Sequence, residues 1–178
     1  MVDEEILLKE IITSVEAEFD ACRKEYGINN LVGYAICLDD TGIMFSPIAN
    51  LQEHISITSE TDKLNAIYNP ENWKVQSAPI KGCSIGEKIN EMYEWCEDYD
   101  NDENWHEEFR SRVYQLSVRT LEGLMKKGYF EMSDNHPFVT VWVIDSEVPF
   151  ARATSWVKRL NNKPTQIKFA NWLEALNN

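Results

Sequence analysis

Residues 138–145 read Phe-Val-Thr-Val-Trp-Val-Ile-Asp, and this stretch decides the fold class. Its β-branched and aromatic side chains favour a β-strand that is buried on at least one face. We therefore predict a central strand of a sheet here, with Trp142 or its neighbours Val141 and Val143 buried.

Residues 31–38 predict a second strand in the same sheet, because larger apolar side chains alternate there with smaller ones. The larger ones are Val32, Tyr34, Ile36 and Leu38. The sequence Asp39-Asp40-Thr41-Gly42 is a turn signal, so residues 43–49 are expected to pair back as a hairpin. Pro47 is expected at the edge or end of that third strand, because proline has no N–H for the ladder.

Several segments have the apolar spacing of amphipathic helices. They cover about residues 4–26, the residues after Ser84, and about 104–127, 148–160 and 164–176, with a short helix near 58–67. The faces predicted to be buried are Leu8, Ile11, Val15, Phe19, Cys22 and Tyr26, then Ile85, Ile89, Met92, Tyr93 and Cys96, then Phe109, Val113, Leu116, Thr120 and Leu124, and finally Phe169, Trp172, Leu173 and Leu176.

Local signals mark where these helices begin and end. Gly27 and Gly128 follow the last apolar residue of their helices and are expected to terminate them. Ser84 and Glu87 have the spacing of a capping box. Residues 68–73, Tyr-Asn-Pro-Glu-Asn-Trp, predict a turn held by two aromatic side chains.

The order helix, hairpin, helices, strand, helices favours an α+β fold, with a small antiparallel or mixed sheet covered by helices. The chain has 178 residues and no internal repeat or linker. We therefore expect residues 1–178 to form a single domain.

Composition and charge restrict the function. No apolar run approaches the roughly 20 residues that cross a bilayer, and the chain begins with acidic residues where a secretory signal is basic, which predicts a cytoplasmic protein. The net charge of −13 disfavours binding to nucleic acid or to an anionic membrane surface and favours a basic protein partner.

Most of the negative charge lies in residues 84–108, which contain ten carboxylates and one lysine. At about 100° per residue, Glu87, Glu91, Glu94 and Asp98 project from one outer face of the predicted helix. Like charges at this spacing destabilise a helix by a few tenths of a kcal/mol each. This cost favours a function for the acids, although charge runs often serve only solubility.

Aromatic residues are interleaved with these acids, at Tyr93, Trp95, Tyr99 and Trp105. Rings supply contact area and acids supply steering and ion pairs, as a surface for a basic protein requires. The alternative is a solvated acidic face whose rings point into the core. The residues predicted to bind the partner are Glu87, Glu91, Glu94, Trp95, Asp98 and Tyr99.

Catalytic and metal-binding motifs are missing from the sequence. None of the histidines His54, His106 and His136 lies in an H-E-x-x-H motif, and the four cysteines form no C-x-x-C pair. The cysteines, expected to be reduced and mostly buried, are Cys22, Cys37, Cys83 and Cys96. Cys83 precedes a predicted helix, where a thiolate would be stabilised, but no base can be paired with it. We predict no catalytic residue, no metal and no cofactor.

Short motifs along the chain carry a family resemblance. They are Val32-Gly33-Tyr34-Ala35-Ile36-Cys37 with its hairpin, Tyr68-x-Pro70-x-x-Trp73, Leu121-Glu122-Gly123-Leu124-x-x-x-Gly128-Tyr129-Phe130, the strand at Phe138, and Arg159-Leu160-Asn161-Asn162. Together they resemble the bacterial domain-of-unknown-function family 4303. Here Tyr68 stands in place of the first tryptophan of a commoner double-tryptophan form, and the proline of the last motif is displaced to Pro164. The resemblance implies a genomic setting beside toxin and immunity genes, and it implies no catalytic residue.

These observations together predict a non-enzymatic acidic binding protein, of the immunity (toxin-neutralising) kind, that binds a basic partner. Two alternatives stay open: a structural or oligomeric interaction protein, and an enzyme of unrecognised type. A deep pocket with convergent polar groups would favour the enzyme. A flat acidic face with protruding rings would favour the binding protein.

Overall fold

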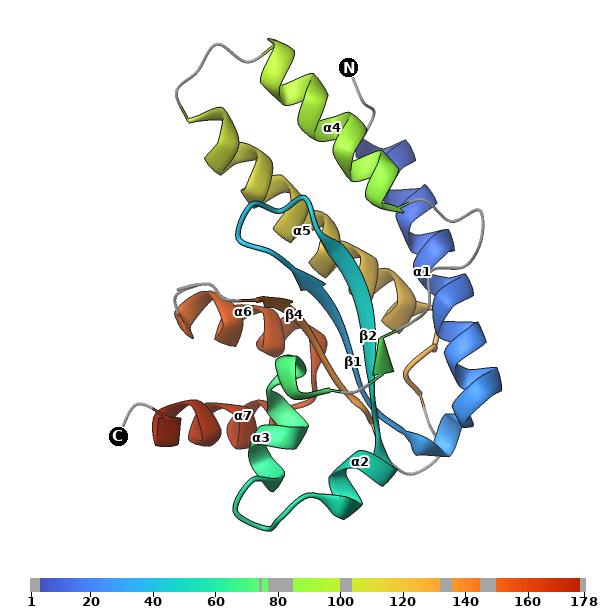
Figure 1. Ribbon diagram of the computed structural model, residues 1–178, viewed down its shortest axis with the longest axis vertical. Coiled ribbons are helices and arrows are strands. Elements are labelled where there is room, and N and C mark those ends of the chain that lie inside the picture. Colours follow the sequence, from blue (N-terminus) through green and yellow to red (C-terminus); the bar gives the residue numbers. More distant parts are fainter. Residues whose placement is uncertain are drawn as a thin grey trace.

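The computed structural model describes residues 4–73, 75–76, 85–99, 104–131, 136–144 and 150–176. A four-stranded sheet with the order β3-β2-β1-β4 lies at its centre (Figure 1). The strands are β1 (Leu31–Leu38), β2 (Phe45–Leu51), β3 (Val75–Gln76) and β4 (Phe138–Val143). The helices are α1 (Glu4–Tyr26), α2 (Gln52–Ile57), α3 (Lys63–Tyr68), α4 (Ile85–Tyr99), α5 (Trp105–Lys126), α6 (Phe150–Leu160) and α7 (Lys163–Leu176), with short 3-10 turns η1 (Ile28–Asn30) and η2 (Pro70–Asn72).

The sheet is mixed, and the predicted α+β fold is confirmed. β1 pairs antiparallel with β2 and parallel with β4. The hairpin turn between β1 and β2 is closed by Gly42, whose N–H donates to the Asp39 carbonyl at 3.2 Å and whose φ of +80° suits glycine. The Asp39 carboxylate also accepts hydrogen bonds from the Thr41 hydroxyl at 2.6 Å and from the Met44 N–H at 3.0 Å. This turn chemistry is what the sequence signal predicted.

Pro47 is not on an edge strand, contrary to that part of its prediction. It lies within β2 opposite Ile36, and β3 flanks β2 on the other side. β3 pairs with β2 only at Ile48 and Ala49, so Pro47 lies outside the described β2–β3 ladder. A proline is tolerated here because the neighbouring strand is very short.

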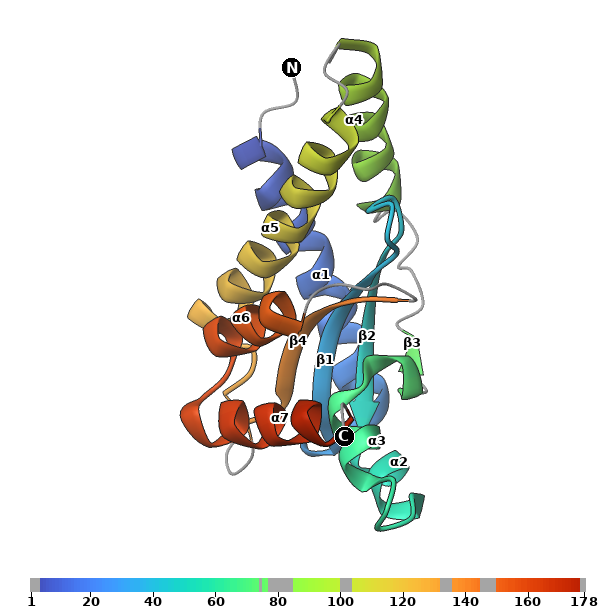
Figure 2. The same cartoon turned by 90° about the vertical axis from the view of Figure 1, so that its left-hand side faces the viewer.

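Two cores lie on opposite faces of the sheet. The first core is packed between the sheet and α1, α4 and α5, and it includes Val15, Tyr34 and Leu121. The second core is packed between the sheet and α3, α6 and α7, and it includes Phe138 and Phe169. Figure 2 shows α1 and α5 on one side of the sheet and α3 on the other.

The prediction that residues 138–144 form a central strand is wrong about position. β4 is a strand in the same sheet as β1, and Val141 and Val143 are buried, but β4 stands at the end of the strand order. Its valines face the first core, while Phe138 and Trp142 face the second. The sequence of β4 is continuously apolar because helices cover both faces of the sheet, and this does not require a neighbouring strand on each side of β4.

The outer edge of β4 is covered by α6 and by one side chain. Trp156 and Leu160 of α6 belong to the first core, whereas Ala153 and Val157 belong to the second, so α6 lies along the edge. The Asn161 amide accepts a hydrogen bond from the Val139 N–H at 3.0 Å and donates one to the Val139 carbonyl at 2.6 Å. Asn161 thus takes the place of a neighbouring strand at that residue.

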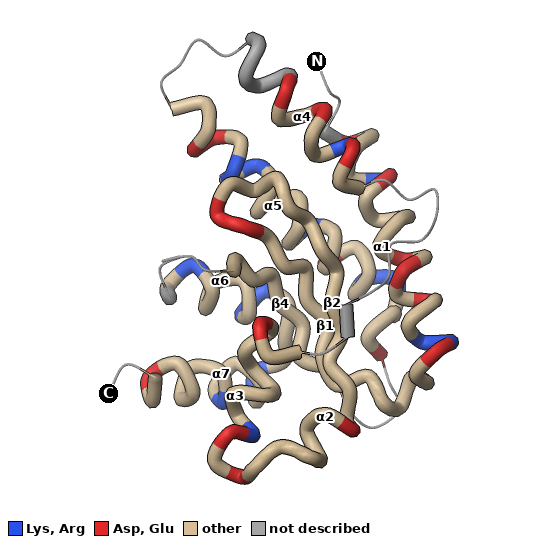
Figure 3. The backbone as a smooth tube through the Cα atoms, viewed as in Figure 1, with Lys and Arg blue, Asp and Glu red and all other residues tan. Residues whose placement is uncertain are grey.

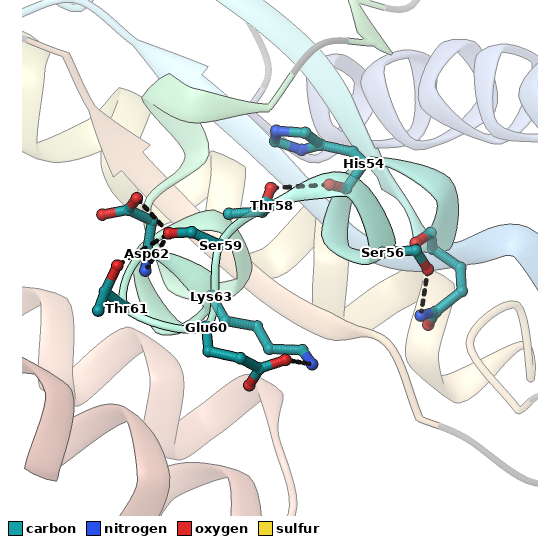
Figure 4. A network of polar contacts seen from close by, with 9 residues as sticks. His54, Ser56, Thr58, Ser59, Glu60, Thr61, Asp62 and Lys63 are labelled. Carbon is teal, nitrogen blue, oxygen red and sulfur yellow. Dashed lines mark hydrogen bonds and ion pairs between the residues drawn. The ribbon is translucent and has the colours of Figure 1, made fainter.

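The short helix predicted near residues 58–67 is replaced by α2 and α3, which flank residues 58–62. Hydroxyl and carboxylate groups interrupt the helix there (Figure 4): the Thr58 hydroxyl donates to the His54 carbonyl at 2.8 Å, and the Ser59 hydroxyl donates to the Asp62 carboxylate at 2.6 Å. Such side chains compete with helical backbone hydrogen bonds, which explains the break.

The other helices agree closely with their predicted bounds, but Leu176, predicted on the buried face of the last helix, is 56% exposed because it is the final residue of α7. α1 has the predicted bounds and is followed by Gly27 at a φ of +79°, and α5 is followed closely by Gly128 at +78°. The turn at residues 68–73 is confirmed, with Tyr68 and Trp73 both buried. Ser84, the predicted cap of α4, lies outside the described residues.

Candidate functional site

The acidic helix α4 has two different faces. Its inner face packs into the first core through Ile85, Ile89 and Met92, which are 5%, 0% and 3% exposed. These side chains hold α4 against α5 and α1. Figure 1 shows that α4 and the first half of α5 extend past the end of the sheet, so the outer face of α4 lies on a projecting part of the molecule.

Three of the predicted partner-binding residues lie on this outer face. Glu87, Glu91 and Glu94 are all exposed. The helical spacing that places them opposite the apolar side chains therefore brings them together on one surface, which we call the α4 acidic face. Asp98 was predicted to extend it, but the side chains of Asp98, Trp95 and Tyr99 lie outside the described part of the structure.

Little positive charge balances the α4 acidic face. Lys88 Nζ lies 3.5 Å from Glu91 Oε2 and 3.8 Å from Glu10 Oε2 of α1. Glu94 accepts a hydrogen bond at 2.9 Å from the neutral side chain of Asn90. Among the described residues, neither Glu87 nor Glu94 forms an ion pair with a lysine or arginine. Figure 3 shows acidic positions recurring along α4.

Several acids on other helices have cations beside them. Glu5 of α1 pairs with Arg119 of α5 at 2.5 Å, and Glu16 of α1 pairs with Lys127. Glu122 of α5 receives both arms of the Arg159 guanidinium, at 2.8 and 2.9 Å. These pairs join neighbouring elements of the fold. The α4 acidic face is different, because among the described residues only Glu91 of its three acids has a cation beside it.

The described aromatic residues near the acids are structural. Tyr93 stacks edge-on against Trp105 and Phe109, with ring centroids 5.3 Å apart in each case. The Trp105 ring in turn lies 5.4 Å from His106. Tyr93 and Trp105 therefore pack α4 onto α5, as in the alternative interpretation of the interleaved rings.

Two cysteines are described, and both are buried. Burial raises the pKa of Cys22 to about 11, with a further contribution from the Glu25 charge. Burial raises the pKa of Cys37 to about 12, and the Glu71 charge adds to this. Both groups are therefore protonated at neutral pH and are poor nucleophiles. Cys83 lies outside the described residues, as does the side chain of Cys96.

In the described ranges, no group of three or more histidine, cysteine, aspartate or glutamate side chains is placed to hold a metal ion. No helix in the described part of the chain is long and apolar enough to cross a membrane.

The sequence does not predict one contact that could contribute to ligand binding. The Trp142 indole Nε1–H donates to Glu71 Oε1 at 2.8 Å, which joins β4 to the turn at η2. The two residues are 71 positions apart in the chain, so no local spacing could pair them. The only signal was the position of Glu71 within a turn flanked by aromatic residues.

Comparison with known proteins gives one result. A family model described as domain of unknown function DUF4303 matches residues 9–162. The matched region contains the whole sheet and runs from within α1 to just beyond α6, leaving α7 outside. No curated protein and no solved structure matches the chain. Because the family model covers most of the sequence, the chain belongs to the DUF4303 family.

Proposed function

We propose that this protein is a non-enzymatic binding protein that engages a basic protein through the α4 acidic face. The single observation that carries the proposal is the arrangement of Glu87, Glu91 and Glu94, exposed together on a projecting helix with only Lys88 among them. Within this proposal the partner is a toxin and the protein is its immunity factor, acting in the bacterial cytoplasm.

Electrostatics supports the choice of a basic partner. Long-range attraction to a chain of net charge −13 accelerates encounter with a cationic protein and disfavours anionic ones. Unbalanced carboxylates on one face then add short-range ion pairs, which set the orientation of the complex. The same acids repel one another within α4, so a bound partner would relieve a strain that the free protein bears.

The test compares two variants of equal charge, once a partner has been captured on the immobilised protein and identified. The first changes Glu87, Glu91 and Glu94 to Gln and Asp98 to Asn. The matched control changes Glu53, Glu60 and Glu131 to Gln and Asp20 to Asn, which are exposed acids away from α4. Association and dissociation rates are measured at two salt concentrations.

We expect the α4 variant to associate on the order of tenfold more slowly than the control, and to lose most of its salt dependence. Equal rates for the two variants would show that only the overall charge matters, and unchanged rates in the α4 variant would remove the acidic face from the binding surface. Replacing Trp95 or Tyr99 by Ala should instead speed dissociation, with a loss of about 2 kcal/mol if the ring is an anchor.

A further inference from the structure

The second face of the sheet carries a carboxylate that is held in place from two directions. Glu71 lies in η2, and its backbone N–H donates to the Asn69 side chain at 3.1 Å. Tyr68 and Trp73, on either side of this turn, are 4% and 7% exposed and anchor it to the second core. The backbone of Glu71 is thus fixed, while its side chain is exposed at the surface.

Trp142 orients the Glu71 carboxylate. The indole N–H donates to Oε1 at 2.8 Å, which engages one carboxylate oxygen. A carboxylate has two oxygens with about four acceptor positions, so most of its capacity to accept hydrogen bonds remains after this contact. The position of the group is therefore set before any ligand arrives, which lowers the entropic cost of binding.

One indole ring, that of Trp142, lies beside this carboxylate. Trp142 is half-buried, and its ring centroid is 6.4 Å from that of Trp172 on α7, with the planes inclined at 45°. The Trp172 ring is only 4% exposed and lies 5.9 Å from that of Tyr68, so it supports the Trp142 ring from within the second core. The face of an indole attracts a cation that lies within about 6 Å of the ring centroid.

The local charge is negative and is not balanced by the described part of the chain. Among the described residues, Glu71 forms no ion pair with a lysine or arginine, and its carboxylate accepts a hydrogen bond from the Trp142 indole. The charge of Glu71 also acts on the Cys37 thiol, which lies opposite Trp142 in the β1–β4 register, and helps to raise the pKa of that thiol.

We propose that Glu71 and Trp142, with the buried Trp172 packed against the Trp142 ring, form a binding site for one organic cation, an ammonium or guanidinium group. The carboxylate pairs with the N–H donors of the cation, and the Trp142 indole contacts its charged or adjacent apolar surface. The site lies on the opposite face of the sheet from α4, which packs into the first core. It is therefore independent of the α4 acidic face.

The test uses ethylguanidinium as the probe, with ethylurea as a neutral molecule of nearly the same shape. Binding is followed through the indole N–H signals of the six tryptophans in ¹H–¹⁵N NMR spectra, with the Trp142 signal assigned by its loss in Trp142→Phe. We expect ethylguanidinium to shift the Trp142 signal saturably. Ethylurea should leave that signal unchanged.

Glu71→Gln is the decisive variant, because glutamine keeps an oxygen that can accept from the Trp142 indole and removes only the charge. It should weaken binding of the probe by about tenfold, as expected for loss of a charged hydrogen bond. The control Glu53→Gln makes the same charge change at an exposed position of α2 and should bind as the wild type does. Retained dispersion of the indole signals shows that each variant is folded.

Several results would overturn the proposal. They are a shift that rises linearly without saturation, an equal response to ethylurea, equal binding by Glu71→Gln and wild type, and equal weakening by Glu53→Gln. Any of these would leave the Glu71–Trp142 bond as a purely structural tie between η2 and β4. None of them bears on the α4 acidic face, because the probe experiment leaves that face unchanged.

The cation can be a free small molecule or a side chain of a protein. A nine-residue Gly/Ser peptide with one central arginine separates these sources. Binding of the peptide about tenfold more tightly than ethylguanidinium assigns the site to an arginine side chain in an extended segment. Equal affinity assigns it to a free cation.

Discussion

At the residue scale, Gly33 shows how closely β1 and the turn after η2 approach each other. A Cβ atom at this position would lie 2.8 Å from Cη2 and 2.9 Å from Cζ2 of Trp73, and 3.0 Å from the Asn50 Cβ. Contacts under 3.0 Å require something to move. The Trp73 ring is buried, and the Asn50 side chain donates a 2.7 Å hydrogen bond to the Ala66 carbonyl. The Trp73 ring can therefore occupy its observed position only because residue 33 has no side chain.

We predict that Gly33→Ala lowers the free energy of unfolding by about 1–3 kcal/mol, the usual cost of overpacking a core. The matched control is Gly86→Ala in α4, where a new Cβ would meet nothing within 4 Å. That control should be neutral or slightly stabilising, because alanine is the better helix former. Urea unfolding of both variants checks this, and equal stability of the two would show that Trp73 is not fixed in place.

The residues of the candidate cation site could not be predicted from the sequence. The sequence predicts that Trp142 is part of a strand and Glu71 part of a turn. The contact between them depends on where η2 lies relative to β4. That path is determined by burial of Tyr68 and Trp73 at long range. In contrast, Glu87, Glu91 and Glu94 could be grouped correctly, because helical spacing alone brings them together.

At the element scale, the limits of local signals are clear from α1, α2 and β4. The bounds of α1 were predictable since its apolar stripe and Gly27 are local features. The break between α2 and α3 was not, because it depends on whether Thr58 and Ser59 side chains bond to the backbone or to Asp62. The place of β4 in the sheet was missed because burial on two faces looks the same in an edge strand and in a central one.

Edge strands usually invite pairing with other chains, and here Asn161 limits this by satisfying both backbone groups of Val139. We predict that Asn161→Ala lowers the free energy of unfolding by about 2 kcal/mol, because the Val139 N–H and carbonyl lose their partner. The control is Asn171→Ala, at an exposed position of α7, which should cost less than about 0.5 kcal/mol.

The same pair of variants should differ in self-association. Asn161→Ala is expected to form larger species on concentration, as measured by light scattering, whereas Asn171→Ala should behave like the wild type. Equal stability and equal scattering for the two variants would mean that α6 alone covers the β4 edge.

At the scale of the whole molecule, charge repulsion opposes the folded state. The net charge is −13, and the described ion pairs are partly or fully exposed, as Glu122–Arg159 is, so each contributes little to stability. Salt screens the net repulsion over long distances while weakening these pairs only modestly. Repulsion is therefore the larger of the two effects at low ionic strength.

We predict that the thermal unfolding midpoint rises by about 2 °C or more between 10 and 150 mM NaCl, the change expected for roughly 0.5–1 kcal/mol in a protein of this size. Calorimetry at fixed pH measures it. The variant that neutralises Glu87, Glu91, Glu94 and Asp98 should have a higher midpoint at low salt and a smaller response to salt. A midpoint that falls with salt would show that the ion pairs dominate instead.

The parallel pairing of β1 with β4 has a consequence for how the protein is made. β1 and β2 are joined by a short turn and can pair as soon as both have left the ribosome. Gly33, however, pairs with Phe138, which is about a hundred residues later in the chain. At typical rates, synthesis of the intervening residues takes about 5–20 s. During that interval the nascent hairpin presents one apolar strand whose final neighbour has not yet been made. Protection of that edge by a chaperone, or a slow codon after the hairpin, would therefore change the yield of active protein without altering a single contact in the finished molecule.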